Sequence, residues 1–239
     1  MRRIIFIGAL ALTIFIIVFM GMHRVSEKLT IEDKTYIAKI LEEAGYDYKS
    51  FINPTTFDAQ LGVISAVQKS GFHTAKETGR AGDLNSAREP KNLYAVSAAY
   101  CGDRARYMDK AFRLLGLESR FVSIYEKRDG KNIFQTLLSR GGQGTQSHAL
   151  LEVKTNKGWM IVDSRHQWLS VTDSGDVISL SNWSHEHSWS SQYSSQTPYP
   201  LLEKDFYKIY GLYSRHGKFY SPFTPYIPDI SWGEFRYNY

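Results

Sequence analysis

The stretch Ala98-Ala99-Tyr100-Cys101-Gly102-Asp103-Arg104-Ala105 holds the only cysteine of the 239-residue chain. From Cys101 onward, apolar residues recur at helical spacing, namely Ala105, Met108, Ala111, Phe112, Leu115 and Leu117. This spacing predicts an amphipathic helix with Cys101 in its first turn, where unpaired backbone N–H groups and the helix dipole stabilise a thiolate. We therefore interpret Cys101 as a nucleophile. The alternative is an inert buried thiol, because free cysteine is among the most buried residue types.

The segment from Ile4 to Met22 is almost wholly apolar, with Arg2 and Arg3 before it and Arg24 after it. A run of about 19 residues can cross roughly 30 Å of hydrocarbon and is longer than the apolar region of a typical signal peptide. No small-residue cleavage site follows, which favours an uncleaved signal anchor over a cleaved signal peptide. By the positive-inside rule, the sequence predicts a single-pass membrane protein whose catalytic domain lies on the extracytoplasmic (periplasmic or extracellular) face.

The rest of the sequence is typical of one globular domain. We divide the chain into an anchor, residues 1–24, and a single domain with an aromatic-rich C-terminal extension, residues 25–239, because about 215 residues fit one domain. The formal net charge is +5, of which Arg2, Arg3 and Arg24 contribute +3, so the domain carries +2. This small excess is no signal for nucleic-acid binding. A single cysteine excludes an intrachain disulfide and leaves the thiol free for chemistry.

Periodicity on both sides of Cys101 predicts a domain of mixed helices and strands. Helices are predicted over Thr30–Gly45 and from Pro54 to Gly71. Strands are predicted at Ser119–Tyr125, Ser147–Val153 and Trp159–Val162. The last two strands flank Asn156-Lys157-Gly158, a turn sequence that predicts an antiparallel hairpin.

In such a hairpin, His148 and Asp163 fall near one rung of the sheet. An imidazole that takes the thiol proton and a carboxylate that orients the imidazole would complete a cysteine-based centre with Cys101. Taken singly, His148 also fits an ordinary strand histidine, and Asp163 also fits a turn former at a strand end.

Four motifs follow one another in the chain: Cys101-Gly102-Asp103-x-Ala105, Leu115-Gly116-Leu117-x-x-Arg120, His148-Ala149-x-x-Glu152-Val153 and Gly158-Trp159-x-x-x-Asp163. Together, from about Tyr100 to Asp163, they resemble the transglutaminase-like superfamily. The resemblance implies an α+β, papain-like fold, in which N-terminal helices, with the cysteine at a helix start, pack on an antiparallel sheet that carries the histidine and the aspartate. One N-terminal transmembrane helix precedes this core. The chain departs from the family pattern at Ala99, Leu150 and Ser164, and none of these positions supplies a catalytic group.

The resemblance implies attack of the Cys101 thiolate on a carboxamide or peptide bond, giving a thioester that water or an amine resolves. It implies catalytic roles for Cys101, His148 and Asp163, with Gln60 as a side-chain oxyanion donor beside the backbone N–H of Cys101. The expected function is an amidase, peptidase or acyl transferase acting on a protein, peptide or other amide-containing substrate, without a cofactor or a metal. The alternative is a catalytically silent binding or scaffolding module tethered to the membrane.

The stretch after Asp163 is rich in aromatic residues, among them Trp168, Trp183 and Trp189. We interpret them as side chains that pack the extension against the domain, and the alternative is an aromatic-lined cleft for carbohydrate or peptide. His185-Glu186-His187 is too sparse to indicate a metal site and favours a polar surface loop.

Overall fold

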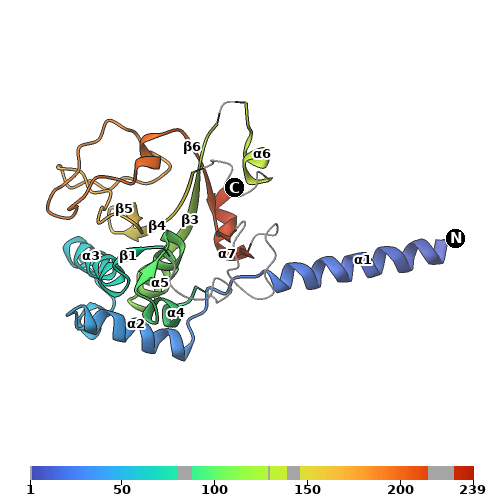
Figure 1. Cartoon of the computed structure of the whole chain (residues 1–239), viewed down its shortest axis with the longest axis horizontal. Coiled ribbons are helices and arrows are strands. Elements are labelled where there is room, and N and C mark those ends of the chain that lie inside the picture. The colour runs from blue at the N-terminus through green and yellow to red at the C-terminus, as the bar shows by residue number, and fades with distance from the viewer. Residues whose placement is uncertain (1, 80–87, 129, 139–145, 215–228) are drawn as a thin grey trace.

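The computed structural model describes residues 2–79, 88–128, 130–138, 146–214 and 229–239, with all their side chains except those of 2–9, 138 and 214. The helices are α1 (Arg2–Met22), α2 (Ile31–Glu43), α3 (Phe57–Thr74), α4 (Pro90–Tyr94), α5 (Cys101–Leu114), α6 (Ile133–Leu138) and α7 (Trp232–Phe235), with 3-10 helices η1 (Tyr48–Phe51), η2 (Pro200–Glu203) and η3 (Arg236–Asn238). The strands are β1 (Glu77–Thr78), β2 (Ala98–Ala99), β3 (Ser119–Glu126), β4 (Ser147–Thr155), β5 (Gly158–Asp163), β6 (Phe206–Tyr210), β7 (Leu212–Ser214) and β8 (Asp229–Ile230). Figure 1 shows α1 pointing away from the other elements, which gather at its C-terminal end.

The helix predicted over Thr30–Gly45 is confirmed as α2. The Thr30 hydroxyl accepts a hydrogen bond from the Asp33 N–H at 3.0 Å, and the Asp33 carboxylate accepts one from the Thr30 N–H at 2.8 Å. This reciprocal pair satisfies two donors that the helix start would otherwise leave unpaired. Gly45, at φ +87°, takes the left-handed conformation that ends the helix.

The helix α3 ends later than the sequence predicts. Thr56 caps its start, but the predicted end at Gly71 is wrong, because the helix continues to Thr74. Gly71 lies where α3 crosses α5, and a Cβ there would lie only 3.2 Å from the Tyr107 ring. The glycine therefore permits close packing of two helices and does not terminate the first.

The central sheet is antiparallel, with strand order β5-β4-β3-β6. The three predicted strands are confirmed as β3, β4 and β5, and the predicted hairpin joins the last two. In that hairpin Lys154 pairs with Trp159 and Leu150 pairs with Asp163. His148 precedes Leu150 by two residues, so it lies diagonally across from Asp163 on the same face. Helices packed on an antiparallel sheet confirm the predicted α+β class.

The sheet is buried on both of its faces. One face packs against α5 and its neighbouring helices through residues that include Phe121, Leu151, Val153, Met160 and Val162. The opposite face carries Leu150 and is covered by the segment after Asp163, which contributes Trp168. Burial on two faces explains why β4 is buried without interruption from His148 to Val153 rather than at alternate residues. Leu150, where the chain departs from the family pattern, lies fully buried beneath the extension.

The aromatic residues of the extension form a cluster on this second face. Trp168 is fully buried, with its ring centroid 4.9 Å from that of Trp189 and 5.8 Å from that of Trp183. The interpretation that these rings pack the extension against the domain is confirmed. His185 and His187 lie edge-on to the same rings. Within the described ranges, no group of three or more His, Cys, Asp or Glu side chains could hold a metal ion.

The predicted membrane anchor falls in α1. Across the part of the chain whose side chains the structure describes, no helix is both long and apolar enough to cross a bilayer. The transmembrane segment stays a prediction.

Two residues of the sequence motifs form an ion pair inside the sheet. The Arg120 guanidinium donates to the Glu152 carboxylate at 2.7 Å, and the Tyr210 hydroxyl donates to the same oxygen at 2.7 Å. The second oxygen accepts the Leu180 N–H at 2.7 Å. Arg120 also lies 4.0 Å from the centre of the Trp159 ring. Since the Glu152 side chain is fully buried, these donors are what make its charge tolerable.

We therefore expect Glu152→Ala to lower the free energy of unfolding by about 3 to 5 kcal/mol, because it leaves the Arg120 charge without its partner. Urea unfolding followed by circular dichroism measures this loss. The matched control is Lys154→Ala on the same strand, which breaks the half-exposed pair with Glu118 and should cost less than about 1 kcal/mol. Equal effects of the two substitutions would contradict the role given to the Glu152 pair.

Candidate active site

Cys101 is the first residue of α5, as the sequence predicts. Tyr100 occupies the position before the helix, and its N–H donates to the Asp103 carboxylate at 2.9 Å. The backbone N–H of Cys101 belongs to the first turn, whose donors have no partner within the helix. The thiol is free, and the residue is only partly buried.

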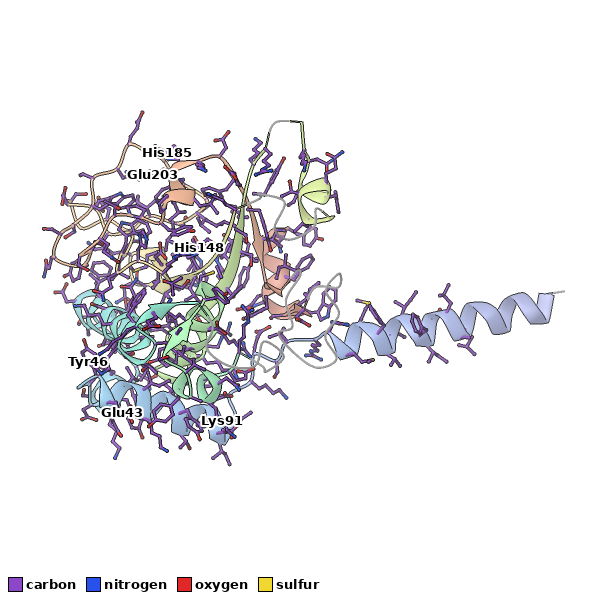
Figure 2. All side chains as sticks on the ribbon, in the orientation of Figure 1. Glu43, Tyr46, Lys91, His148, His185 and Glu203 are labelled. Carbon is purple, nitrogen blue, oxygen red and sulfur yellow. The ribbon has the colours of Figure 1, made fainter. Side chains whose placement is uncertain are left out.

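His148 and Asp163 are joined by a short buried hydrogen bond. His148 Nε2 lies 2.8 Å from Asp163 Oδ1, and the two side chains are 1% and 0% exposed. The same carboxylate accepts the backbone N–H groups of Arg165 at 2.8 Å, His166 at 3.2 Å and Tyr199 at 3.1 Å. Figure 2 shows His148 inside the body of the protein. The carboxylate is thus fully hydrogen-bonded and cannot easily change its orientation.

Because Asp163 occupies Nε2, the other ring nitrogen of His148 is the one available to the thiol. Nδ1 is buried, and no acceptor or donor among the described residues forms a hydrogen bond of good geometry with it. The Cys101 thiol is nonetheless close enough for each group to shift the pKa of the other. Contacts of this kind are often loose without substrate and tighten when it binds.

The thiol meets the imidazole at an edge of the sheet. Ala149 on β4 pairs with Ser123 of β3, but strand β5 ends at Asp163, opposite Leu150, so Ala149 has no strand partner on the β5 side. The Ala149 carbonyl accepts the hydroxyl of Ser164, and its N–H donates to the Cys101 thiol. Ser164 stands where the family usually has proline, and a proline would lack this hydroxyl. The Ser164 hydroxyl therefore ties the residue after Asp163 to strand β4.

The charges around the thiol favour its ionised form. Burial would raise the pKa of the Cys101 thiol, but His148, the Ala149 N–H and the positive charge of Arg88 lower that pKa below its ordinary value. Arg88 is held next to the site because its guanidinium packs on Gly102, where a Cβ would lie 2.8 Å from it, and faces the Asp103 carboxylate at 3.6 Å.

The pKa values of His148 and Asp163 are also shifted in the directions that favour their charged forms. Burial would lower the pKa of the His148 imidazole, but Asp163 and then Cys101 raise it to about 9. Burial would raise the pKa of the Asp163 carboxyl, but His148 and the N–H groups of Arg165 and His166 hold it below its usual range. A lowered thiol pKa and a raised imidazole pKa favour a thiolate–imidazolium pair at neutral pH, and that pair is lost as the pH rises through about 9.

Two residues that the sequence analysis missed hold this arrangement in place. The Tyr199 ring stacks on the His148 ring with centroids 4.2 Å apart. Gln68, on α3 and buried, donates to the carbonyl oxygens of Asp163 and Trp168, each at 2.8 Å. Gln68 therefore ties the loop after the aspartate to the helix. Helical periodicity places Gln68 on the buried side of α3, but nothing in the sequence says which strand it meets.

The structure does not bring Gln60 to the thiol. Its amide donates to the Asn156 side chain at 3.1 Å and accepts the Asn156 N–H at 2.9 Å, at the turn of the β4–β5 hairpin. That turn lies eight residues along β4 from His148, or about 25 Å at the rise of an extended strand. The assignment of Gln60 as an oxyanion donor is thus corrected, because α3 runs along the hairpin with its first turn at the far end.

A search of curated proteins gave no match. A family model, described as the transglutaminase-like superfamily, matches residues 61–164. The match begins on α3, just after Gln60, and ends just after Asp163, so it includes Cys101 and His148. The resemblance inferred from the motifs is confirmed, because residues 61–164 match the model of the transglutaminase-like superfamily, whose fold is typically that of cysteine-based enzymes.

Proposed function

We propose that the protein is a membrane-anchored thiol enzyme of the transglutaminase-like type that cleaves or transfers acyl groups of carboxamide or peptide bonds. Cys101 is the nucleophile, His148 the general base and acid, and Asp163 the residue that orients the imidazole. The observation that carries the proposal is the buried 2.8 Å bond from Asp163 to His148 Nε2, which leaves Nδ1 for the thiol.

In the proposed reaction, the Cys101 thiolate attacks the carbonyl carbon of the substrate, and the carbonyl oxygen becomes an oxyanion. The backbone N–H of Cys101, at the start of α5, is positioned to donate to that oxyanion. Collapse of the tetrahedral intermediate breaks the C–N bond, and the His148 imidazolium gives its Nδ1 proton to the leaving amine. This leaves a thioester on Cys101. Water or an amine, deprotonated by the neutral imidazole, then attacks the thioester carbonyl. The C–S bond breaks, the acyl group leaves as a carboxylic acid or a new amide, and the thiolate–imidazolium pair is restored.

The anchoring part of the proposal rests on the charge pattern of the N-terminus. The apolar run from Ile4 to Met22 lies in α1, which projects away from the domain in Figure 1. The basic residues Arg2 and Arg3 would remain in the cytosol, placing the domain on the extracytoplasmic side of the membrane. There it would meet protein, peptide or other amide-containing substrates.

Alkylation tests the proposed nucleophile without knowledge of the substrate. Because Cys101 is the only cysteine, iodoacetamide reports on it alone, and Cys101→Ser should abolish labelling. We expect the wild-type rate at pH 6 to 7 to exceed that of an ordinary thiol by about tenfold, since only a few per cent of an unperturbed thiol is ionised there. A second, smaller rise should follow near pH 9, where the imidazolium loses its proton and leaves a more nucleophilic thiolate.

The variant His148→Ala should lose both the fast labelling at pH 6 to 7 and the second rise near pH 9. Without the imidazolium, burial is opposed only by the Ala149 N–H and Arg88, so the pKa of the thiol should rise and labelling should require a higher pH than in the wild type. Circular dichroism of the variant establishes that it is folded. Indistinguishable pH–rate profiles for wild type and His148→Ala would contradict the assignment of His148 as the base that activates Cys101. They would favour a catalytically silent module.

Asp163→Asn tests the orienting carboxylate. Removing the negative charge takes away the main influence that opposes burial, so the pKa of His148 should fall from about 9 by more than one pH unit. Titration of the His148 ring by NMR measures this change directly. Asp173→Asn, in the surface turn after Val171, is the matched control and should leave the titration unchanged. An unaltered His148 titration in Asp163→Asn would show that the carboxylate does not set the charge of the imidazole.

A further inference from the structure

A cavity of about 320 Å³ lies beside the candidate site, at the C-terminal end of α3. Its polar lining comes from Tyr46, Lys69, His73, Lys76 and Gln167. Tyr46, labelled in Figure 2, follows α2, whereas Gln167 belongs to the loop after Asp163. The cavity therefore joins three segments that are distant in the sequence.

The polar groups of this cavity are suited to donate hydrogen bonds to an anion. No carboxylate is among the lining residues, and in the described ranges neither Lys69 nor Lys76 has an ion-pair partner. Gln167 uses its amide oxygen to accept the hydroxyl of Ser195 at 3.0 Å, which leaves its amide nitrogen to donate. Such a set of donors stabilises a negatively charged group.

The dipole of helix α3 does not explain why all these polar residues line one cavity. Basic residues are favourable in the last turn of a helix, which would explain His73 on α3. Lys76, however, lies beyond the residue that caps the helix end, Ala75. Tyr46 and Gln167 come from other segments. A bound anion would explain why hydrogen-bond donors from three segments line the same cavity.

Residues next to the cavity lining bind the segments that carry the candidate catalytic groups. On one side, Gln68, the neighbour of Lys69, binds the Asp163 carbonyl, and Gln167 lies on the loop that begins at Asp163. On the other side, Lys76 follows Ala75, whose carbonyl accepts the Arg104 guanidinium at 2.6 Å. Arg104 lies one helical turn after Cys101 on α5. Phe72 of the cavity lining packs against the Arg104 guanidinium, 5.0 Å from the ring centre, so the cavity borders the first turns of the helix that begins with Cys101.

Further positive charge surrounds the site itself. Arg165 is exposed, and its guanidinium lies 5.3 Å from the centre of the Tyr199 ring, which stacks on His148. The charge of Arg88 acts on the thiol from another direction. The domain as a whole has a net charge of only +2 beyond the anchor and its flanks, so this concentration of cations is local rather than a general property of the surface.

We propose that this cavity binds a carboxylate of the acyl donor, so that the substrate is an acidic peptide whose amide or peptide bond reaches Cys101. The inference rests on the proposed function, since the reaction at Cys101 requires an amide while the cavity favours an anion. A peptide with an acidic side chain combines both groups in one molecule. The role of the cavity is to bind and orient the substrate, and its residues take no part in the chemical steps.

Protection of Cys101 from alkylation tests the proposal with defined probes. The peptides acetyl-Gly-Glu-Gly-amide, acetyl-Gly-Gln-Gly-amide and acetyl-Gly-Lys-Gly-amide are compared for their ability to slow the reaction of Cys101 with iodoacetamide in the full chain. We expect the glutamate peptide to protect at the lowest concentration. This advantage should shrink as salt is raised, because the cationic groups are exposed.

The double variant Lys69→Met/Lys76→Met should weaken protection by the glutamate peptide about 3- to 10-fold, the size expected for two exposed ion pairs. It should leave protection by the glutamine peptide unchanged. The matched control is Lys28→Met/Lys34→Met, which removes the same charge from exposed lysines outside the cavity and should have no effect.

Equal protection by the glutamate and glutamine peptides, or a glutamate preference that survives in the double variant, would overturn the proposal. Absence of protection by all three peptides would overturn it as well. Displacement of the glutamate peptide by inorganic phosphate as strongly as by acetate would indicate a general anion site instead of a carboxylate subsite. The rate of alkylation without peptide reports on the nucleophile alone, so failure of this inference is distinguishable from failure of the proposed function.

Discussion

The arrangement of the site depends on one buried carboxylate. Asp163 has no exposure to solvent, so its charge is tolerable only because four donors surround it. One donor is His148 of β4, two are backbone N–H groups of the loop that follows β5, and the fourth is the N–H of Tyr199 in the extension. Three separate segments must therefore be in place before the aspartate can be buried as an anion. The same bonds fix the ring of His148 and decide which nitrogen faces the thiol.

The thiol is governed by two opposing effects. Burial disfavours its ionisation, whereas the imidazolium, a backbone N–H and a nearby guanidinium favour it, and the second set prevails. The geometry allows this without closing the site, since His148 is buried but Cys101 remains partly accessible. Buried charges thus stabilise the ionised form of a thiol whose residue is only partly buried. In the proposed reaction, protons move between sulfur and Nδ1 while the Asp163 bond to Nε2 stays intact.

The segment after Asp163 is a structural layer of the domain. It covers the face of the sheet opposite α5, where Trp168 packs over Leu150, and it delivers Tyr199 to the candidate site. A sheet buried on both faces is more rigid than one exposed to water on one side, which suits a hairpin that must hold His148 in one orientation. The extension also contributes Gln167 to the cavity beside the site. Folding of the extension and construction of the site are therefore coupled.

Local patterns in the sequence determined the helices α2 and α5, the strands β3 to β5 and the β4–β5 hairpin, because each depends on residues a few positions apart. The short turn at Asn156 fixed the register, and with it the approach of His148 to Asp163. The two glutamines of α3 show what local sequence patterns cannot predict, namely which of them lies at the site. Gln60 and Gln68 are both buried on one helix, yet only Gln68 lies at the end where the site forms. Only the packing of α3 along the hairpin could distinguish them.

Tyr199 illustrates the same limit, since 36 residues separate it from the aspartate that accepts its N–H. No periodicity links positions so far apart. The sequence by itself determined which chemical groups the protein has and which of them local geometry brings together, namely Cys101 at a helix start and the His148–Asp163 pair on a hairpin. The tertiary structure decided which partners surround them, because contacts between distant segments depend on how complete helices and sheets pack against one another.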